Sequence, residues 1–251
     1  MRNDIGIAII DVYSQGDLNS CLEYLSIANN KLIVSDTKNK IPDELNYKKY
    51  GNGVPFATLR NWAISQFRLQ GDINHIFLVN TNQIVRDINV FDESIKIAET
   101  FGTKVIFGPE TSVLSIEDDE ENVVLNLSEK INNDFIYISN DIVSEIGYFD
   151  ERYLNTSHLD VLDYVERLRE KKLHPPIGFN PMINGQIEKS QSKIQKTNYR
   201  EIFDKDKTVD MSFGYFFHKY SYIPSQNDPK PVSNDVLVKE LEELQQKYAK
   251  K

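Results

Sequence analysis

Three polar side chains end runs of aliphatic residues in the first third of the 251-residue chain. Asp11 follows Gly-Ile-Ala-Ile-Ile, Asp36 follows Lys-Leu-Ile-Val-Ser, and Asn80 follows His-Ile-Phe-Leu-Val. Such runs are typical of strands that a parallel sheet buries on both faces. In open α/β sheets the carboxyl ends of these strands share one edge, and ligands bind there. The sequence therefore predicts that Asp11, Asp36 and Asn80 border one ligand site.

Two carboxylates form a second candidate for chemistry. Asp160 and Asp163 are three residues apart in segment 160–173, whose apolar residues recur at helical spacing, so both lie on the same face of a helix. A carboxylate in such a position could act as a general base toward a hydroxyl group. The alternative is a solvated acidic helix start, which the helix macrodipole favours. The pattern alone allows both interpretations.

Strands and amphipathic helices alternate along the first two thirds of the chain, which indicates a Rossmann-like α/β domain with a mostly parallel sheet. Residues 115–127 read as a hairpin with an acidic, solvated tip. The expected strands are 4–11, 31–36, 73–80, 104–109 and 134–139, and the expected helices are 17–30, 56–69, 90–102 and 160–173.

The bulk composition is that of an ordinary globular protein. A net charge of −9 argues against general nucleic-acid binding, because phosphate backbones attract clustered Lys and Arg. Cys21 is the only cysteine, which excludes an internal disulfide and a cysteine-rich zinc site. No apolar run approaches the roughly 18 residues of a transmembrane helix, and the N-terminus lacks the pattern of a signal peptide. We therefore expect a cytoplasmic location.

The composition changes beyond Asn184, so we divide the chain into a domain at residues 1–184 and a C-terminal extension at residues 185–251. The extension becomes aromatic at 213–222, where core packing and a lid over a site are the alternatives. Its last segment, 235–251, has an apolar stripe that predicts an amphipathic helix, which could mediate oligomerisation.

Five segments of the chain resemble segments of the family 2 type of glycosyltransferase with a GT-A fold, and they occur in the same order. The resemblance covers about Gly6 to Phe179. It implies a GT-A fold, a mostly parallel sheet flanked by helices, and transfer of a hexose from a nucleotide sugar. The segments are IAIIDVYSQGDLNSCLEYL at 7–25, LIVSDTK at 32–38, GVPFATLRNWAI at 53–64, EIGYFDERY at 145–153 and DVLDYVERL at 160–168.

The resemblance also implies roles for individual residues. Asp160 would be the base of an inverting transfer, with Asp163 as the second candidate. Asn82 and His174 are the candidates for contact with a metal ion. The pocket for a UDP- or GDP-linked donor would include Asp11, Tyr13, Asp36, Arg60, Asn61 and Asn80.

Two departures from the family pattern concern charge. The metal-binding Asp-x-Asp triplet falls on Asn80-Thr81-Asn82, and Val161 stands where many members have a second acid. Amide oxygens can coordinate Mn²⁺ or Mg²⁺ but add no charge to hold the cation, so it should be weakly bound or dispensable. A diphosphate at the triplet would meet no carboxylate repulsion, and the amide N–H groups could bind it directly.

The expected function is therefore transfer of a sugar from a nucleotide-activated donor to an acceptor hydroxyl, for example on a glycan. The amide triplet and Val161 favour an alternative, a catalytically inactive glycosyltransferase-like protein that binds sugars or nucleotides or acts as a scaffold. A nucleotidyltransferase is a further rival, but such enzymes need a Gly-rich, basic first loop that DVYSQGDLN at 11–19 lacks.

Overall fold

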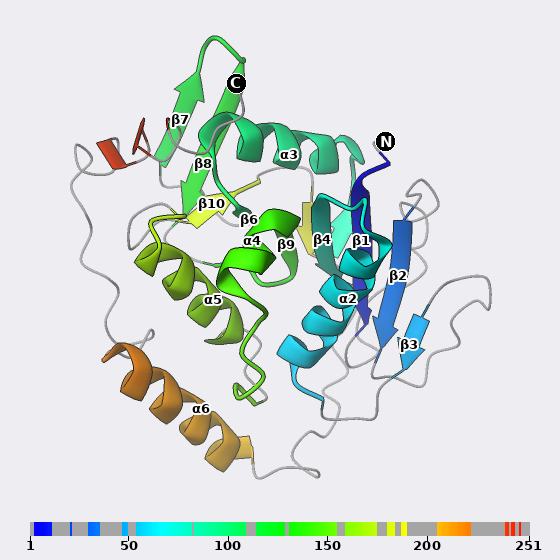
Figure 1. Ribbon diagram of the computed structural model, residues 1–251, viewed down its shortest axis with the longest axis vertical. Coiled ribbons are helices and arrows are strands. Elements are labelled where there is room, and N and C mark those ends of the chain that lie inside the picture. Colours follow the sequence, from blue (N-terminus) through cyan, green and yellow to red (C-terminus); the bar gives the residue numbers. More distant parts are fainter. Residues whose placement is uncertain are drawn as a thin grey trace.

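The computed structural model contains a nine-stranded mixed sheet and a separate two-stranded sheet (Figure 1). The strands of the large sheet are β1 (Ile5–Asp11), β2 (Asn30–Ser35), β3 (Tyr47–Lys49), β4 (His75–Asn80), β6 (Val105–Gly108), β7 (Leu114–Asp118), β8 (Val123–Ser128), β9 (Phe135–Ser139) and β10 (Asn180–Met182). The structure describes residues 3–11, 21, 30–35, 47–49, 54–81, 83–108, 114–128, 131–154, 159–174, 180–183, 187–189, 205–221, 239–240, 242–243 and 246.

The spatial order of the strands is β3-β2-β1-β4-β9-β6-β10-β8-β7. Strands β1 to β4 run parallel, and β6 is parallel to β10. β9 lies antiparallel between β4 and β6, and the β7–β8 hairpin adds antiparallel pairing at one edge. The expected α/β architecture with a mainly parallel sheet is confirmed, while the reversed direction of β9 was not predicted.

Hydrophobic side chains of the sheet alternate between two buried layers. In β1, Ile5, Ile7 and Ile9 pack into the layer that contains α3 (Asn89–Phe101), whereas Ala8 and Ile10 face the opposite layer. Burial on both faces explains why the strand sequences are nearly continuous hydrophobic runs.

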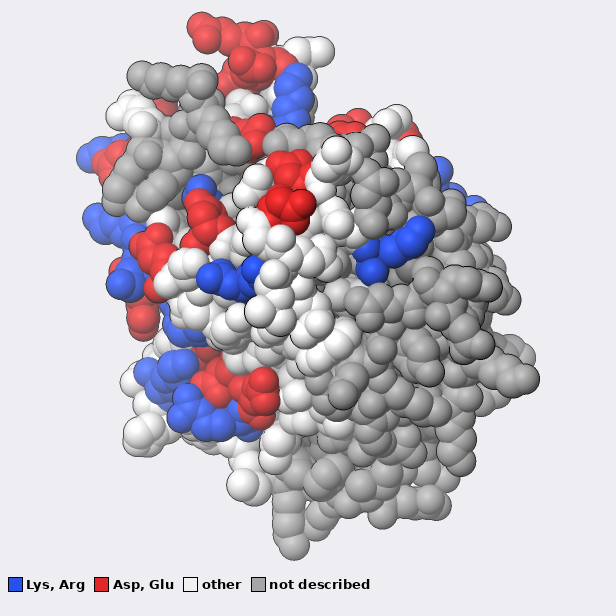
Figure 2. Space-filling view, turned by 45° about the vertical axis from the view of Figure 1, so that its right-hand side comes forward, with Lys and Arg blue, Asp and Glu red and all other residues white. Residues whose placement is uncertain are grey.

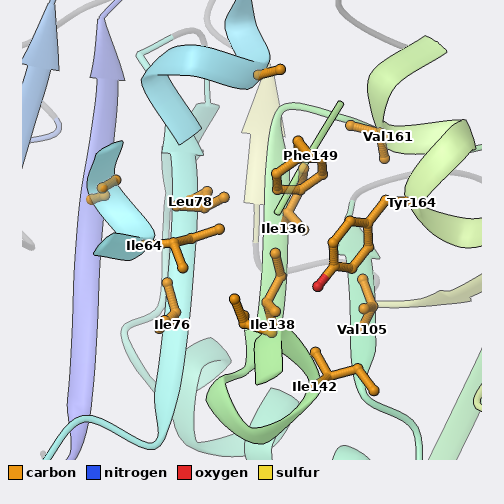
Figure 3. Packing of buried hydrophobic residues seen from close by; sticks show 14 of the residues in the cluster. Ile64, Ile76, Leu78, Val105, Ile136, Ile138, Ile142, Phe149, Val161 and Tyr164 are labelled. Carbon is orange, nitrogen blue, oxygen red and sulfur yellow. The ribbon is translucent and has the colours of Figure 1, made fainter. Parts of the chain in front are cut away.

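The second layer packs three helices against the sheet: α2 (Phe56–Gln70), α4 (Asn140–Ile146) and α5 (Leu159–Glu170). Figure 3 shows Ile64 of α2 beside Leu78 and Ile76 of β4, and Tyr164 of α5 near Val105 of β6. Ile142 of α4 belongs to the same buried cluster. Val161 belongs to the same buried cluster. A carboxylate at that position would be desolvated in the core.

The described residues of the C-terminal region contact the rest of the fold through a strand and a helix. β11 (Ile187–Lys189) pairs antiparallel with β5 (Gln83–Val85), just beyond the end of β4. Residues 213–220 of the aromatic segment lie within a helix, α6 (Lys205–Tyr220), which sequence reasoning missed. Phe216 of α6 is buried with Tyr153 and Leu159, so the core-packing alternative is confirmed at that position.

The surface and the chain end add little to the placement of the site. On the face shown in Figure 2, Lys and Arg lie intermixed with Asp and Glu, and acidic side chains gather at the top of the view. In the described part of the chain, no helix is both long enough and apolar enough to span a membrane. The predicted terminal helix lies mostly outside the described residues, so that prediction stays untested.

Candidate functional site

The carboxyl ends of β1 and β4 lie side by side. Ile10 pairs with Asn80, and the Thr81 backbone N–H donates to the Ile10 carbonyl oxygen over 3.3 Å. Asp11 is the last residue of β1 and pairs with Ser35 at the end of β2. The prediction that these strand ends share one edge of the sheet is therefore confirmed for the backbone.

A carboxylate that sequence reasoning missed lies at this edge. Asp134 immediately precedes β9, and its carbonyl oxygen accepts the Asn80 backbone N–H over 2.7 Å. The Asn80 side-chain amide donates to Asp134 Oδ1 over 2.6 Å, and the Gln83 amide donates to Oδ2 over 3.3 Å. We call Asn80, Gln83 and Asp134 the strand-end cluster.

The strand-end cluster corrects one expectation about the amide triplet. A diphosphate at the end of β4 would meet the Asp134 carboxylate, and the Asn80 amide N–H already donates to that carboxylate. The amides therefore do not make this edge free of negative charge. Asn80 and Gln83 are buried, whereas Asp134 is half-buried.

A buried ion pair adjoins the cluster. The Arg60 guanidinium of α2 is fully buried and donates to Oδ2 of Asp160 in the first turn of α5. Its other terminal nitrogen donates to the carbonyl oxygen of Asn133 over 3.2 Å, one residue before Asp134. Asn80 bonds to Asp134, and Arg60 bonds to Asn133 and Asp160. These contacts bring three of the predicted site residues into one region.

The surroundings of Asp160 affect its protonation. Its side chain is 1% exposed, and burial raises its pKa above the ordinary value, while the charge and hydrogen bond of Arg60 oppose that rise. Oδ1 has no hydrogen-bond partner among the described residues. The Arg60 guanidinium also lies 5.3 Å from the ring centroid of Phe56 and 5.5 Å from that of Phe149.

Asn61 holds a turn in the structure. Its side-chain oxygen accepts the Phe149 backbone N–H over 2.9 Å, and its amide donates to the Phe149 carbonyl oxygen and to Glu151. Thr58 donates to the other Glu151 oxygen over 2.9 Å. Asn61 therefore fixes turn 147–151 against the first turns of α2.

Asp163 is fully buried and forms hydrogen bonds with side chains of α6. It accepts hydrogen bonds from Tyr153, Arg167, Lys219 and Tyr220. Burial and the Asp163 charge raise the pKa values of Tyr153 and Tyr220, so both phenols remain donors at neutral pH. Asp160 and Asp163 lie on one helix, as predicted, but their carboxylates contact different partners.

Turn 147–154 is also tied to α6. Tyr215 and Arg152 donate to Asp150, and the Ser212 hydroxyl bonds to both the backbone N–H and the carbonyl oxygen of Leu154. Burial would raise the pKa of Asp150, but the hydrogen bonds from Arg152 and Tyr215 outweigh it and lower the pKa to about 2. These contacts fix the chain shortly before α5 and Asp160.

The remaining predicted residues are placed differently. His174 is buried and lies four residues beyond the last residue of α5. Because a helix of 12 residues is about 18 Å long, His174 and the Asp160 end of α5 are far apart. Tyr13, Asp36 and Asn82 lie outside the described residues, as does the side chain of Asp11.

The comparisons with known proteins give matches only at the level of structure. No family model matches the chain, and no curated protein matches its sequence. GalNAc-T7, solved with UDP, GalNAc and Mn²⁺, aligns with a TM-score of 0.51 and 9% identity, over 97% of this chain and 55% of that one. The chain has the GT-A fold.

Two further GT-A structures align less well. For S. aureus TarS 1–349 the TM-score is 0.48 with 11% identity, over 95% of this chain and 80% of that one. For the catalytic domain of Drosophila β1,4-galactosyltransferase 7, solved with xylobiose, it is 0.38 with 8% identity, over 98% and 81%. These two alignments carry no conclusion about the reaction of this chain.

The GT-A fold raises the question of a metal ion. Among the described residues, no group of three or more His, Cys, Asp or Glu side chains is placed to hold one. The strand-end cluster offers one carboxylate with two amides. That set is too poor for an all-protein cation site, but Mg²⁺ commonly binds through one or two carboxylates plus substrate phosphates. The described residues therefore do not form a cation site by themselves.

Proposed function

We propose that the protein is a glycosyltransferase that moves a sugar from a UDP- or GDP-linked donor to an acceptor hydroxyl. One observation carries this proposal: in a GT-A fold, the strand-end cluster lies at the carboxyl edge of β4, where open α/β sheets bind ligands. Asp11, Tyr13 and Asp36 complete the nucleotide pocket in this proposal. Dependence on a divalent cation is weak, because one carboxylate holds it poorly without substrate.

The proposed transfer inverts the configuration of the donor sugar. The acceptor oxygen bonds to the anomeric carbon, while the bond from that carbon to the diphosphate breaks and its electron pair leaves with the diphosphate. Asp160 takes the acceptor proton through Oδ1. Two features support this role: Oδ1 has no described partner, and burial raises the pKa of the carboxyl group above its ordinary value. The acceptor must reach this atom from the site edge, because Asp160 is buried.

Arg60, Asn61 and Asp163 then have supporting roles. Arg60 orients Asp160 through their ion pair, Asn61 fixes turn 147–151, and Asp163 holds α6. This assignment differs from the expected place of Arg60 in the donor pocket, because the guanidinium is fully buried against Asp160.

The test begins with binding. A calorimetric screen of UDP- and GDP-sugars, with Mn²⁺ and with EDTA, should find at least one donor that binds. A turnover assay with that donor should then show that its sugar is hydrolysed or transferred. Asp160→Asn should keep that affinity and lower turnover by roughly 10²–10⁴, the usual worth of a positioned general base. Glu145→Gln, which changes an exposed carboxylate on α4, is the matched control. Normal turnover of Asp160→Asn would exclude Asp160 as the base.

A second candidate function is non-catalytic nucleotide or sugar binding. It is favoured by the ion pairs of the two candidate carboxylates on α5: Asp160 contacts Arg60, and Asp163 contacts Arg167 and Lys219. This alternative predicts the same donor affinity with no turnover for any acceptor. Single-turnover assays at high enzyme concentration distinguish the two functions.

A further inference from the structure

The first turn of α5, which carries Asp160, contacts two other helices. The Arg60 guanidinium of α2 binds Oδ2 of Asp160. Leu159, the first residue of α5, is fully buried in a cluster with Phe216 of α6 and with Tyr153. The carboxylate of this turn is therefore held by α2, while its start is packed against α6.

Polar side chains at the end of α6 extend this contact along α5. α6 lies next to α5 (Figure 1). Lys219 and Tyr220 both donate to Asp163, one turn further along α5 than the packed first residue. The Lys219 ammonium also lies 3.8 Å from a carboxylate oxygen of Asp150. Lys219 therefore joins three parts of the fold, which are α6, the second turn of α5 and turn 147–154.

The contact with Arg60 fixes only one of the two carboxylate oxygens of Asp160. Arg60 binds Oδ2, whereas Oδ1 has no hydrogen-bond partner among the described residues. The position of Oδ1 therefore depends on where the α5 backbone places the residue. A displacement of about 1 Å that originates far from the chemistry can lower a rate by about 10²-fold. Contacts that hold the start of α5 can thus control turnover without touching either substrate.

We propose that α6 is a positioning element for Asp160, and that Phe216 and Lys219 are the residues through which it acts. This inference rests on the proposed function, in which Asp160 is the general base. Phe216 holds the start of α5 through Leu159. Lys219 holds the second turn of α5 through Asp163. α6 then affects the rate through the backbone of α5 and contacts neither the donor nor the acceptor.

The first test compares two neighbouring aromatic residues of α6 and requires no turnover. Phe216 is fully buried and Phe217 is 51% exposed, so Phe216→Ala removes the contact with α5 and Phe217→Ala is the matched control. Hydrogen exchange of the full chain is followed by mass spectrometry. We expect faster exchange in the first two turns of α5 for Phe216→Ala and wild-type exchange for Phe217→Ala. Peptides from α3, which packs in the other layer, should exchange at the wild-type rate in both variants.

The second test separates positioning from donor binding. Lys219→Met keeps the apolar stem and removes the charge that contacts Asp163 and Asp150. With UDP- and GDP-sugars as donors, it should lower kcat by about 10–100-fold, while the calorimetric donor affinity stays at the wild-type value. Lys219→Arg keeps the charge and should recover most of kcat. Lys96→Met, at an exposed lysine on α3, is the control and should behave as wild type.

The outcomes separate the positioning role from the proposed function. Wild-type exchange at the start of α5 in folded Phe216→Ala overturns the positioning role, whether or not the protein shows turnover. If Phe216→Ala does not fold, wild-type exchange and wild-type kcat in Lys219→Met overturn it equally. A parallel loss of donor affinity and kcat in Lys219→Met also contradicts it, because the effect would then lie in donor binding. If the wild type uses no donor, the proposed function fails, while the exchange comparison still decides whether α6 holds α5.

Discussion

The Arg60–Asp160 pair gives the sharpest prediction about stability. Replacing Arg60 with Met keeps an apolar stem between the rings of Phe56 and Phe149 and removes the guanidinium. The carboxylate of Asp160, which is 1% exposed, then loses its charged partner inside the fold. Removal of one member of a buried ion pair typically costs about 3–5 kcal/mol. For a domain of this size that corresponds to a fall in Tm of about 6–20 °C.

The loss should depend on pH in a defined direction. Burial raises the pKa of Asp160, and in Arg60→Met no guanidinium opposes the rise. A carboxyl group whose pKa is higher in the folded than in the unfolded state favours folding when it is protonated, below its unfolded value near 3.8. Its contribution is lost as pH rises through the folded-state pKa. The Tm difference between wild type and Arg60→Met should therefore shrink as the solution is acidified.

Thermal and urea unfolding at neutral and mildly acidic pH measure both effects. Arg68→Met is the matched control on α2, because Arg68 makes partly exposed contacts to Asn140 and Ser144. The double variant Arg60→Met with Asp160→Leu should recover much of the lost stability, since no buried charge remains. The reasoning would be refuted if Arg60→Met lowered the free energy of unfolding by less than about 1 kcal/mol. It would also be refuted if Arg60→Met cost as much in a protein that already carries Asp160→Leu as it costs in the wild type.

Three further predictions concern other parts of the fold. Asp163→Ala should lower the free energy of unfolding by about 3–5 kcal/mol, because it leaves two cations without their carboxylate. Urea unfolding measures this loss. A loss no larger than that from replacing an exposed carboxylate would contradict the prediction. Burial raises the pKa of Asp150 but its hydrogen bonds lower it to about 2, so its contribution is complete above pH 4 and disappears toward pH 2. Acid unfolding of wild type and Asp150→Asn should therefore converge in that window, and parallel curves would exclude the linkage. Gly6→Ala should cost about 1–3 kcal/mol, because a Cβ there would lie 2.8 Å from the Phe67 ring. Gly214→Ala, with no atom within 4 Å, should instead stabilise α6 by about 0.5–1 kcal/mol, and calorimetric Tm values compare the two.

Local sequence pattern was sufficient to predict elements whose hydrophobic residues form a continuous run or recur at a regular spacing. The runs that end at Asp11 and Asn80 became β1 and β4, and the helix expected to stop at Gly102 does so, with that glycine at φ 69°. The acidic segment 115–127 forms the expected hairpin. In each case the pattern lies within a few neighbouring residues, and hydrophobic burial favours one type of secondary structure.

The missed features depend on contacts between distant residues. Asp134 is 54 residues from Asn80 in sequence, and the antiparallel direction of β9, which brings them together, leaves no mark on a fully buried strand. Likewise, Asp160 and Asp163 have the same helical setting, yet only the packing of α2 and α6 decides which cations they contact. α6 was not predicted because its aromatic residues and Gly214 obscure the helical periodicity of the sequence.

The central claim, that the strand-end cluster binds the diphosphate of a nucleotide sugar, is tested most directly by calorimetric titration of UDP- and GDP-sugars into the wild type and an Asn80→Leu variant. Asn80→Leu removes the amide that contacts Asp134 and preserves approximate volume. We predict saturable binding by the wild type that weakens at least about tenfold in the variant, a loss of about 1.4 kcal/mol. Equal affinity of the two proteins, or no binding by the wild type, would contradict the claim.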